Sequence, residues 1–283
     1  MDTAIASRRD GLESLDVRGF TAAYHHGGAG PPVIAAHCSS ASHKALRPLI
    51  QQLEQRYEVF APDLIGYGAS DRWPADRPLE PETEVALITE LAALAGAPVH
   101  LVGHSYGAML SLEAARQLGT KVGSLTLIEP VSFHLLRPGG HEIPLAQITR
   151  VAGGVLQAMR AGQPKQAAAI YMGFWMGRWR WWLAPKRLKR GVLETIDKVA
   201  KEFALIERME ADLADYAAIR APTRLIMGGR TRAPARAVID ILLETLPNVE
   251  RRTIPQAGHM SPLSHPDRVN PLVLEHLAVC TGA

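Results

Sequence analysis

Short apolar segments alternate with longer amphipathic segments along most of this chain. The segments that predict strands are Val33–Ala36, Tyr57–Ala61, Val99–Val102, Ser124–Ile128, Arg224–Met227 and Val249–Ile254. The segments that predict helices are His43–Gln55, Pro81–Ala95, Ser105–Leu118, Pro234–Leu246 and Pro266–Val279. Strands that alternate with helices are typical of βαβ units. The pattern therefore predicts an α/β fold with a mostly parallel sheet and helices on both of its faces.

The alternation stops after about residue 132 and resumes near residue 222. The sequence between these points has helical patterns and no convincing strand. Its breaks are expected at Gly139-Gly140, Pro144, Gly153-Gly154, Pro164 and Pro185. We therefore expect an α/β core in residues 1–132 and 217–283, with a helical cap or lid inserted as residues 133–216.

The composition is that of an ordinary globular protein. The chain has 283 residues, of which 47% are hydrophobic and 21% are charged. These fractions exclude a disordered, collagen-like or coiled-coil chain. The 31 basic and 28 acidic side chains leave a formal net charge of only +3. Nucleic-acid binding needs a stronger basic patch than this, so no nucleic-acid partner is expected.

Cysteine content and hydropathy indicate the compartment. The two cysteines, Cys38 and Cys280, exclude a scaffold of several disulfides and leave a single disulfide open. Residues 1–20 lack the apolar core of a signal peptide. The chain has no uninterrupted run of about 18 apolar residues, so no membrane span is expected. These features predict a cytoplasmic protein.

The most informative motif is Gly103-His104-Ser105-Tyr106-Gly107, which directly follows the predicted strand Val99–Val102 and opens a predicted helix. In this strand–turn–helix setting, G-x-S-x-G forms a tight turn that presents the serine at the carboxyl edge of a sheet. Glycines are needed because the positions two before and two after the serine have little room for a side chain. Ser105 is therefore the candidate nucleophile, and a glycine-rich turn with an incidental serine is the alternative.

With this motif the sequence resembles the α/β-hydrolase family, and the resemblance covers most of the chain. Asp63–Ser70 is similar to the family's D-x-x-G-x-G-x-S segment, Pro32–His37 to its third strand and oxyanion loop, and Ala257–Met260 to its late histidine loop. The resemblance implies an eight-stranded, mostly parallel sheet with a lid inserted after the sixth strand. That insertion point matches the one that the periodicity predicts.

A serine hydroxyl needs an adjacent base to act as a nucleophile. His259 follows the last predicted strand, in the Ser-then-His chain order that this fold uses, so it is the candidate base. The family's usual acid follows the seventh strand, where this chain has Thr231. Threonine has no charge to stabilise the imidazolium that forms during catalysis. Either the triad is degraded, or another strand supplies the acid.

Glu129 is the alternative acid, because it directly follows the predicted sixth strand. In the family's sheet that strand lies between the nucleophile strand and the seventh strand, and certain haloalkane dehalogenases use an acid at this position. We therefore predict a catalytic triad of Ser105, His259 and Glu129, with Thr231 as a hydrogen-bonding neighbour. A Glu129 that only anchors the entry to the lid is the competing interpretation.

The negative charge that develops on the carbonyl oxygen during acyl transfer needs N–H donors. The predicted donors of this oxyanion hole are the backbone N–H groups of Tyr106, directly after the nucleophile, and Ser39, after the third strand. Cys38 replaces the glycine that the family commonly has beside His37, and we expect it to be a structural cysteine. His37 is expected to support this loop by hydrogen bonding and is also a candidate substrate-pocket residue.

Trp175, Trp179 and Trp182 have the i, i+4, i+7 spacing of one helix face. We expect them to line an apolar substrate pocket, to pack the lid against the core, or to do both. The segment Arg178–Arg190 contains six basic residues and no acidic residue. It is expected to be a solvated face, with an anionic lipid surface or a carboxylated substrate as the alternative contact.

These residues predict a serine hydrolase that acts through an acyl-enzyme on a small-molecule carboxylic ester or lactone with an apolar part. A carbon–carbon bond hydrolase and a cofactor-free peroxidase are alternatives on the same fold. Epoxide hydrolases and haloalkane dehalogenases are disfavoured, because their chemistry uses a carboxylate nucleophile where this chain has Ser105. A ligand-binding or sensor protein of low turnover is the alternative from another class, and Thr231 at the usual acid position is its main support.

Metal and phosphate chemistry have little support. The sequence shows no Cys/His cluster with ligand spacing and no glycine-rich loop followed by lysine. We therefore expect no metal and no cofactor. The sequence does not indicate an oligomeric state.

Overall fold

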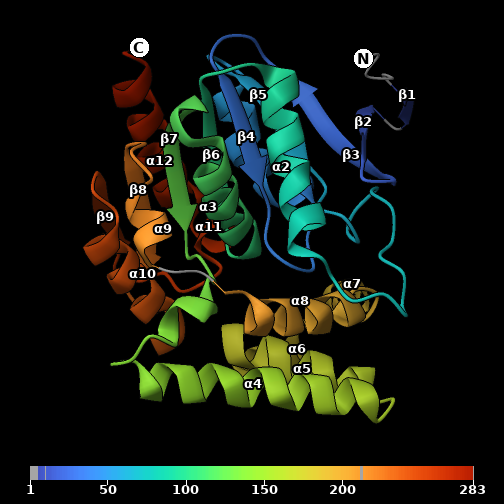
Figure 1. The fold of residues 1–283 in the computed structure, drawn as a ribbon. Coiled ribbons are helices and arrows are strands. Elements are labelled where there is room, and N and C mark those ends of the chain that lie inside the picture. The colour runs from blue at the N-terminus through green and yellow to red at the C-terminus, as the bar shows by residue number, and fades with distance from the viewer. Residues whose placement is uncertain (1–5, 10, 211–212, 283) are drawn as a thin grey trace.

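The computed structural model describes residues 6–9, 11–210 and 213–282. Residues 1–5, 10 and 283 of the expected core and residues 211–212 of the expected cap lie outside this part. A nine-stranded sheet forms the centre of the described chain, in the order β1-β2-β3-β5-β4-β6-β7-β8-β9 (Figure 1). The strands are β1 (Ala6–Arg9), β2 (Leu12–Val17), β3 (Phe20–Gly27), β4 (Pro32–Ala36), β5 (Glu58–Pro62), β6 (Val99–His104), β7 (Val122–Ile128), β8 (Thr223–Gly228) and β9 (Val249–Ile254).

The sheet is parallel from β5 to β9 and antiparallel at its other edge. β4 pairs in parallel with both β5 and β6, and the parallel pairing continues through β7 and β8 to β9. β1, β2, β3 and β5 pair antiparallel in that order. The predicted fold class is confirmed, because β2–β9 form the expected eight-stranded, mostly parallel sheet. The short β1 adds a ninth strand at the edge.

The six apolar segments of the sequence correspond to β4–β9. β6 and β8 are buried along their whole length, which is typical of parallel strands covered on both faces. The apolar pattern does not predict β2 and β3, because their half-buried polar residues interrupt any continuous apolar run. The antiparallel edge is thus the part of the sheet that hydrophobic periodicity leaves unmarked.

Helices cover both faces of the sheet, as predicted. α2 (Pro81–Ala95), α3 (Tyr106–Leu118) and α10 (Ala233–Thr245) pack in one hydrophobic cluster. α1 (Arg47–Leu53) and α12 (Pro266–Thr281) pack in a second cluster on the opposite face. Successive residues of the central strands alternate between the two clusters, as the two-residue period of a strand requires. The shorter elements are the 3-10 helices His43–Leu46 and Gly119–Lys121 and the helix α11 (Ser261–Ser264).

Between β7 and β8 the described residues form helices and no strand. These are a 3-10 helix (Phe133–Leu136), α4 (Glu142–Arg160), α5 (Pro164–Met176), α6 (Arg178–Leu183), α7 (Lys186–Leu193), α8 (Ile196–Arg208) and α9 (Leu213–Ala217). Figure 1 shows α4–α8 gathered beyond one end of the sheet, on the side toward which β7 points. We call α4–α8 the cap helices and propose that residues 133–216 form the cap.

The predicted break at Gly153-Gly154 is wrong, because α4 continues through both residues. α5 packs against α4 here, and a Cβ on Gly154 would lie 3.4 Å from the side chain of Ile170. This packing offsets the poor helix propensity of glycine, which costs about 1 kcal/mol per residue relative to alanine. Pro144 also lies inside α4, in the first turn, where a missing N–H breaks no hydrogen bond.

Two further expectations concern the pairing of the cysteines and the presence of membrane-spanning helices. Cys38 and Cys280 are both free thiols, so the disulfide that the sequence left open does not form. None of the helices in the described ranges is long and apolar enough to cross a bilayer.

Candidate active site

Ser105 occupies the turn between β6 and α3. Its backbone has φ 56° and ψ −114°, a conformation that residues other than glycine rarely adopt. A Cβ on Gly103 would lie 2.5 Å from Cα of Ala108, and a Cβ on Gly107 would lie 2.4 Å from the carbonyl oxygen of His37. Both flanking positions therefore require glycine. The turn holds Ser105 at the amino end of α3.

His259 lies in the loop between β9 and α11, with its Nε2 2.9 Å from Oγ of Ser105. His104 donates from its Nε2 to the backbone carbonyl of His259 at 2.9 Å. Burial lowers the pKa of His104 to about 3, so this neighbour stays neutral. The ring of Trp175 stacks on the imidazole of His259, with 3.6 Å between ring centroids and 21° between planes. His259 is thus fixed through both its backbone and its ring.

Glu129 follows β7 and is completely buried. Its Oε2 lies 3.1 Å from Nδ1 of His259, and its Oε1 accepts the backbone N–H of Gly228 at 2.7 Å. Its backbone has φ 51° and is held by a hydrogen bond from its N–H to the carbonyl of Ile226. A residue held in such a conformation is typical of functional sites. The carboxylate faces one imidazole nitrogen while Ser105 faces the other.

Thr231, at the position of the family's usual acid, donates a hydrogen bond from its hydroxyl to Oε2 of Glu129. The threonine therefore contacts the carboxylate that contacts His259. The structure brings together the three residues of the predicted triad and the predicted neighbour. Their catalytic roles are taken up as a proposal below.

The two predicted oxyanion donors line the same cavity as Ser105. The N–H of Tyr106 belongs to the first residue of α3, and the N–H of Ser39 follows β4. Within the described ranges, neither N–H has a hydrogen-bond acceptor. Both groups are therefore free to bind a developing negative charge.

His37 supports the loop that carries Ser39, as expected. Its Nδ1 donates to the carbonyl of Cys38 at 2.7 Å, and its Nε2 accepts the N–H of Leu64 at 3.0 Å. Burial lowers the pKa of His37 to about 4, so the ring is neutral, as these two bonds require. His37 is not among the residues that line the cavity of Ser105. Its candidacy as a pocket residue is corrected accordingly, because both ring nitrogens are already used inside the loop.

The cavity that contains Ser105 is small. Its volume is about 20 Å³, which is room for about one water molecule. Apart from Ser39 and Tyr106 its walls are mainly apolar and come from the start of the cap and from α5 and α8. A substrate can enter only if some of these side chains move.

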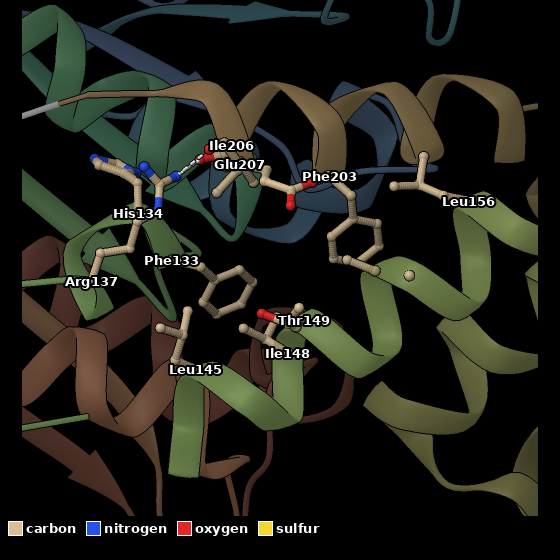
Figure 2. Close-up of a pocket in the computed structure, with 12 residues that line it drawn as sticks. Phe133, His134, Arg137, Leu145, Ile148, Thr149, Leu156, Phe203, Ile206 and Glu207 are labelled. Carbon is tan, nitrogen blue, oxygen red and sulfur yellow. Dashed lines mark hydrogen bonds between the residues drawn. The ribbon is translucent and has the colours of Figure 1, made fainter. Parts of the chain in front are cut away.

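A second cavity of about 280 Å³ lies beside the first, between α4, α8 and the 3-10 helix at the start of the cap (Figure 2). Phe133, Phe203 and Ile206 line both cavities, so these three side chains form the partition between them. Figure 2 shows Phe133 and Phe203 projecting toward the middle of the larger cavity. The walls of the larger cavity are mainly apolar.

The structure splits the predicted tryptophan stripe. α5 and α6 are separate helices, with Gly177 at φ 94° between them. Trp175 is buried against His259 and lines the cavity of Ser105. Trp179 and Trp182 are 65% and 75% exposed and lie away from that cavity. The expectation that they line the substrate pocket or pack the cap is therefore corrected, because the stripe assumed one continuous helix.

Sequence reasoning did not single out Glu84, Lys198 and Glu202, which are buried close to the site. Glu202 lines the cavity of Ser105. Lys198 and Glu202 are four residues apart on α8, a spacing that usually indicates a solvent-exposed ion pair. No pattern in the sequence marks Glu84 as their partner. The tertiary structure alone brings the three together.

Other buried acidic side chains serve local structure. Asp63, in the predicted D-x-x-G-x-G-x-S segment, accepts hydrogen bonds from the backbone and the ring of His43, each at 2.8 Å. It also accepts the N–H of Ala69 at 2.8 Å.

In the part of the chain that the structure describes, no group of three or more His, Cys, Asp or Glu side chains has an arrangement that would hold a metal ion.

The sequence is similar to those of known proteins. The model of a family described as the alpha/beta hydrolase family matches residues 14–272. Haloalkane dehalogenase 2 of Mycobacterium bovis is 23% identical over 274 residues, which cover 88% of each chain. The pimeloyl-[acyl-carrier protein] methyl ester esterase of Methylococcus capsulatus is 27% identical over 260 residues, covering 89% of this chain and 96% of the esterase.

The fold is also found among solved structures. The enol-lactonase of Burkholderia xenovorans superposes with a TM-score of 0.75 and 17% sequence identity. The superposition covers 94% of this chain and 99% of the lactonase. At this level of identity the similarity establishes the fold.

Proposed function

Because this chain belongs to the alpha/beta hydrolase family, we propose that it is a serine hydrolase that cleaves carboxylic esters or lactones through an acyl-enzyme. The observation that carries the proposal is the continuous contact from Ser105 through His259 to Glu129. Oγ of Ser105 lies 2.9 Å from Nε2 of His259, and Nδ1 of His259 lies 3.1 Å from Glu129. This is the arrangement of nucleophile, base and acid that acyl transfer needs.

In the first half-reaction, Oγ of Ser105 forms a bond to the carbonyl carbon while Nε2 of His259 accepts the hydroxyl proton. The carbonyl electron pair moves onto oxygen, where the N–H groups of Ser39 and Tyr106 stabilise it. The intermediate collapses as the bond to the leaving alkoxide breaks, and His259 gives its proton to that oxygen. The acyl group is then bound to Ser105.

Water completes the reaction. His259 accepts a proton from a water molecule whose oxygen attacks the acyl carbon, and the same two N–H groups bind the second oxyanion. The bond to Ser105 then breaks and Oγ takes the proton back, which releases the carboxylic acid. Glu129 keeps the imidazole in the tautomer with the proton on Nδ1 and stabilises its positive charge in both half-reactions.

The cavities support a substrate with an apolar part. The walls of the cavity of about 280 Å³ are mainly apolar, and only three side chains separate it from the cavity of Ser105. An acyl chain or ring that displaces Phe133 and Phe203 would occupy it. The esterase and the enol-lactonase described above support esters and lactones as the substrate class.

The competing functions have less support. Displacement of a halide on this fold uses a carboxylate nucleophile, and this chain has Ser105 at that position. The sensor hypothesis rested on Thr231, yet His259 contacts the carboxylate of Glu129, so the threonine leaves the histidine with an acidic partner. The carbon–carbon bond hydrolase shares the same three residues and is separated from the esterase by its substrates.

Turnover of p-nitrophenyl acetate, butyrate and octanoate, and of a simple lactone, tests the proposal. We expect hydrolysis by the native protein and a fall in kcat of at least about 10³-fold in Ser105→Ala. Ser264→Ala, which changes an exposed serine, is the matched control and should retain full activity. Absence of hydrolysis with all four substrates would overturn the proposal. Cleavage of a vinylogous 1,5-diketone in their place would favour the carbon–carbon bond hydrolase.

A further inference from the structure

Three ionisable residues that the proposed mechanism does not use are buried beside the site. Glu84 on α2 and Lys198 and Glu202 on α8 are each at most 3% exposed. Nζ of Lys198 donates to Oε2 of Glu84 at 2.6 Å and lies 3.4 Å from Oε1 of Glu202. We call these three residues the Glu–Lys–Glu cluster. One ammonium group is thus shared between two carboxyl groups.

The cluster holds the side chains of both proposed oxyanion donors. The hydroxyl of Tyr106 donates to Oε2 of Glu84 at 2.7 Å, and the hydroxyl of Ser39 donates to Oε2 of Glu202 at 2.5 Å. Tyr106 and Ser39 come from segments that are far apart in the chain. The two carboxyl groups and the lysine between them connect the side chains of these two residues.

Two of the three members come from a cap helix. Lys198 and Glu202 lie one turn apart on the same face of α8. The stem of Lys198 passes over Gly66, where a Cβ would lie 2.9 Å from Cε of the lysine. Gly66 has φ +90°, so a glycine both permits the backbone turn and leaves room for the lysine. The contact of α8 with the core thus includes a charge inserted toward the oxyanion donors.

A contribution to folding stability does not explain well why these three ionisable residues are buried together. Burial of charged groups carries a desolvation cost, and apolar residues of the same volume often pack at least as well. An additional role at the neighbouring site accounts for the placement better.

We propose that the Glu–Lys–Glu cluster is a positioning device that sets the separation of the Ser39 and Tyr106 N–H groups when α8 is docked. The proposal rests on the proposed function, because it assigns a task to the oxyanion donors. It makes α8 part of the catalytic geometry: the donors are held for the tetrahedral intermediate only while Lys198 is in place.

Lys198→Met tests the device, because methionine keeps an unbranched stem and removes the charge. Lys201→Met is the matched control. Lys201 lies on the same helix and donates to the carbonyls of Pro74, Ala75 and Arg77, outside the site. Three quantities are compared for the two variants: kcat, KM, and the inhibition constant of an alkyl trifluoromethyl ketone, whose adduct with Ser105 carries an oxyanion.

We expect Lys198→Met to lower kcat by about 10- to 100-fold, with KM changed less than about threefold. The ketone should bind more weakly by the same factor as the loss in kcat. Lys201→Met should leave kcat, KM and the inhibition constant of the ketone unchanged. If Lys198→Met does not fold, Ser39→Ala and Tyr106→Phe remove the two tethers, keep both N–H groups and should give the same pattern at about tenfold each.

Equal kcat and ketone affinity in native protein and Lys198→Met would overturn the positioning role. A loss of thermal stability without a loss of kcat would overturn it as well. Absence of ester or lactone hydrolysis by the native protein would instead refute the proposed function, so the two failures are distinguishable.

A second, independent inference concerns the outer surface of α6 and α7. Trp179, Trp182 and Leu183 have the i, i+3, i+4 spacing of one helix face, and they are 65%, 75% and 62% exposed. Leu188 on α7 is 40% exposed. Large apolar side chains that are grouped in solvent mark contact sites for other molecules. We call Trp179, Trp182 and Leu183 the apolar stripe.

The charged side chains of the segment that carries the apolar stripe are all basic. Between residues 178 and 190 the chain has six basic residues and no acidic residue. Arg180 lies over the ring of Trp179 at 5.3 Å, and Nζ of Lys189 donates to the carbonyl of Trp182 at 2.7 Å. Basic groups therefore surround the exposed tryptophans. Tryptophan and lysine or arginine together are the composition that favours the interface of an anionic bilayer.

We infer that the apolar stripe and its basic neighbours dock the protein on an anionic lipid surface. Trp179 and Trp182 would enter the headgroup region, and the basic side chains would attract the lipid charge. Docking at this face brings the cap helices next to the phase in which apolar esters concentrate.

Co-sedimentation with vesicles tests the docking. The vesicles are a 3:1 mixture of phosphatidylcholine and phosphatidylglycerol, and pure phosphatidylcholine. We expect binding to the mixed vesicles that weakens in 0.5 M salt and falls at least about tenfold in Trp179→Ser/Trp182→Ser. The control pair Leu94→Ser/Val279→Ser, which changes apolar residues that are exposed elsewhere, should bind like native protein.

Failure of the native protein to bind the mixed vesicles would overturn the docking proposal, and so would equal binding of the tryptophan variant. Light scattering of the native protein and of the tryptophan variant without lipid tests whether a second copy of the chain binds this surface. A native dimer that becomes monomeric in the tryptophan variant would assign the surface to a second copy of the chain and would likewise overturn the proposal.

Discussion

Glu129 follows β7 and Thr231 follows β8, and β7 lies between β6 and β8 in the sheet. The carboxyl ends of these parallel strands meet at one edge. A carboxylate after β7 therefore reaches the same imidazole nitrogen that an acid after β8 would reach. The hydroxyl of Thr231 then becomes a donor to that carboxylate. In the proposed triad, the position after β7 supplies the acid and the position after β8 supplies a hydrogen-bond donor to it.

We predict that Glu129→Gln lowers kcat by about 10³- to 10⁴-fold on any ester that the native protein hydrolyses. The amide keeps the shape of the side chain, but it supplies no negative charge and its N–H₂ group favours the wrong tautomer of His259. The measurement is steady-state hydrolysis of p-nitrophenyl butyrate. Thr231→Val, which removes only the supporting donor, should cost about tenfold. Near-native turnover of Glu129→Gln would rule out Glu129 as the acid.

Candidate residues that belong to a local motif are predictable from the sequence, whereas residues that act by tertiary contact are not. The elbow around Ser105 and the loop of His259 carry glycines that the geometry requires. Glu129 is recognisable because it stands at the end of an apolar strand. Glu202 has no such context, since its place on α8 resembles that of a solvent-exposed partner of Lys198. Only the docking of α8 buries it.

At the scale of elements, the cap shows where periodicity is a poor guide. The three tryptophans fit one helical face, but α5 ends before Gly177, where φ is 94°, and a new helix begins after it. A glycine that ends a helix and a glycine inside one are not distinguishable from the sequence alone, as the continuation of α4 through Gly153 and Gly154 also shows. Tertiary packing decides between them. Strands β4–β8 were predictable because their buried runs are long enough to mark both faces of the sheet. In β9 only Ile254 is buried.

The cavity beside α4 leads to a prediction about acyl length. Ala152 lines this cavity, and phenylalanine at this position would fill much of its volume of about 280 Å³. We expect Ala152→Phe to lower kcat/KM for p-nitrophenyl octanoate by about tenfold or more and to leave the acetate within about twofold, because the acetyl group does not reach this cavity. Gln157→Phe, at an exposed position of the same helix, is the matched control. An equal effect on both esters would place the acyl chain elsewhere.

At the scale of the whole molecule, the sheet gathers residues from five segments of the chain at one edge, those that follow β4, β6, β7, β8 and β9. The helices between β7 and β8 cover that edge. The alternation of strands and helices in the sequence predicts this plan, including the place of the insertion. The antiparallel strands β2 and β3 escape it, because their half-buried polar residues interrupt the apolar runs that mark the central strands. The proposed lipid contact of α6 depends on which of its side chains are exposed to solvent, and the sequence pattern does not predict that exposure.

Buried histidines should make the whole fold sensitive to acid. Burial lowers the pKa of His37, His134 and His276 to about 4 and that of His104 to about 3. In the unfolded chain their pKa is near 6.5. Between pH 6.5 and 4 the unfolded state therefore binds more protons, so stability falls as the pH falls through this window. Burial raises the pKa of the carboxyl groups of Glu90, Glu113 and Glu202, which acts in the opposite sense, but these three groups are outnumbered by the four histidines.

We predict that the free energy of unfolding, measured by urea titration, decreases by at least about 2 kcal/mol between pH 7 and pH 5. His276→Gln should show a shallower decrease. His276 lies on α12, away from the site. Its contribution to the free energy of unfolding falls by about 1.4 kcal/mol for each unit by which the pH drops between its pKa values in the unfolded and the folded protein. A free energy of unfolding that is constant or rises toward pH 5 would contradict the neutral, buried state of these histidines.

Reaction with a fluorophosphonate tests directly whether Ser105 is an activated nucleophile, because such reagents phosphonylate an activated serine much faster than an ordinary hydroxyl. We predict a mass increase of one phosphonyl group per chain, located at Ser105 by peptide mass spectrometry. Ser105→Ala should remain unlabelled, and Glu129→Gln should be labelled at least about 100-fold more slowly than native protein. No label on the native protein, or a label at any residue other than Ser105, would contradict the assignment of this chain as a serine hydrolase.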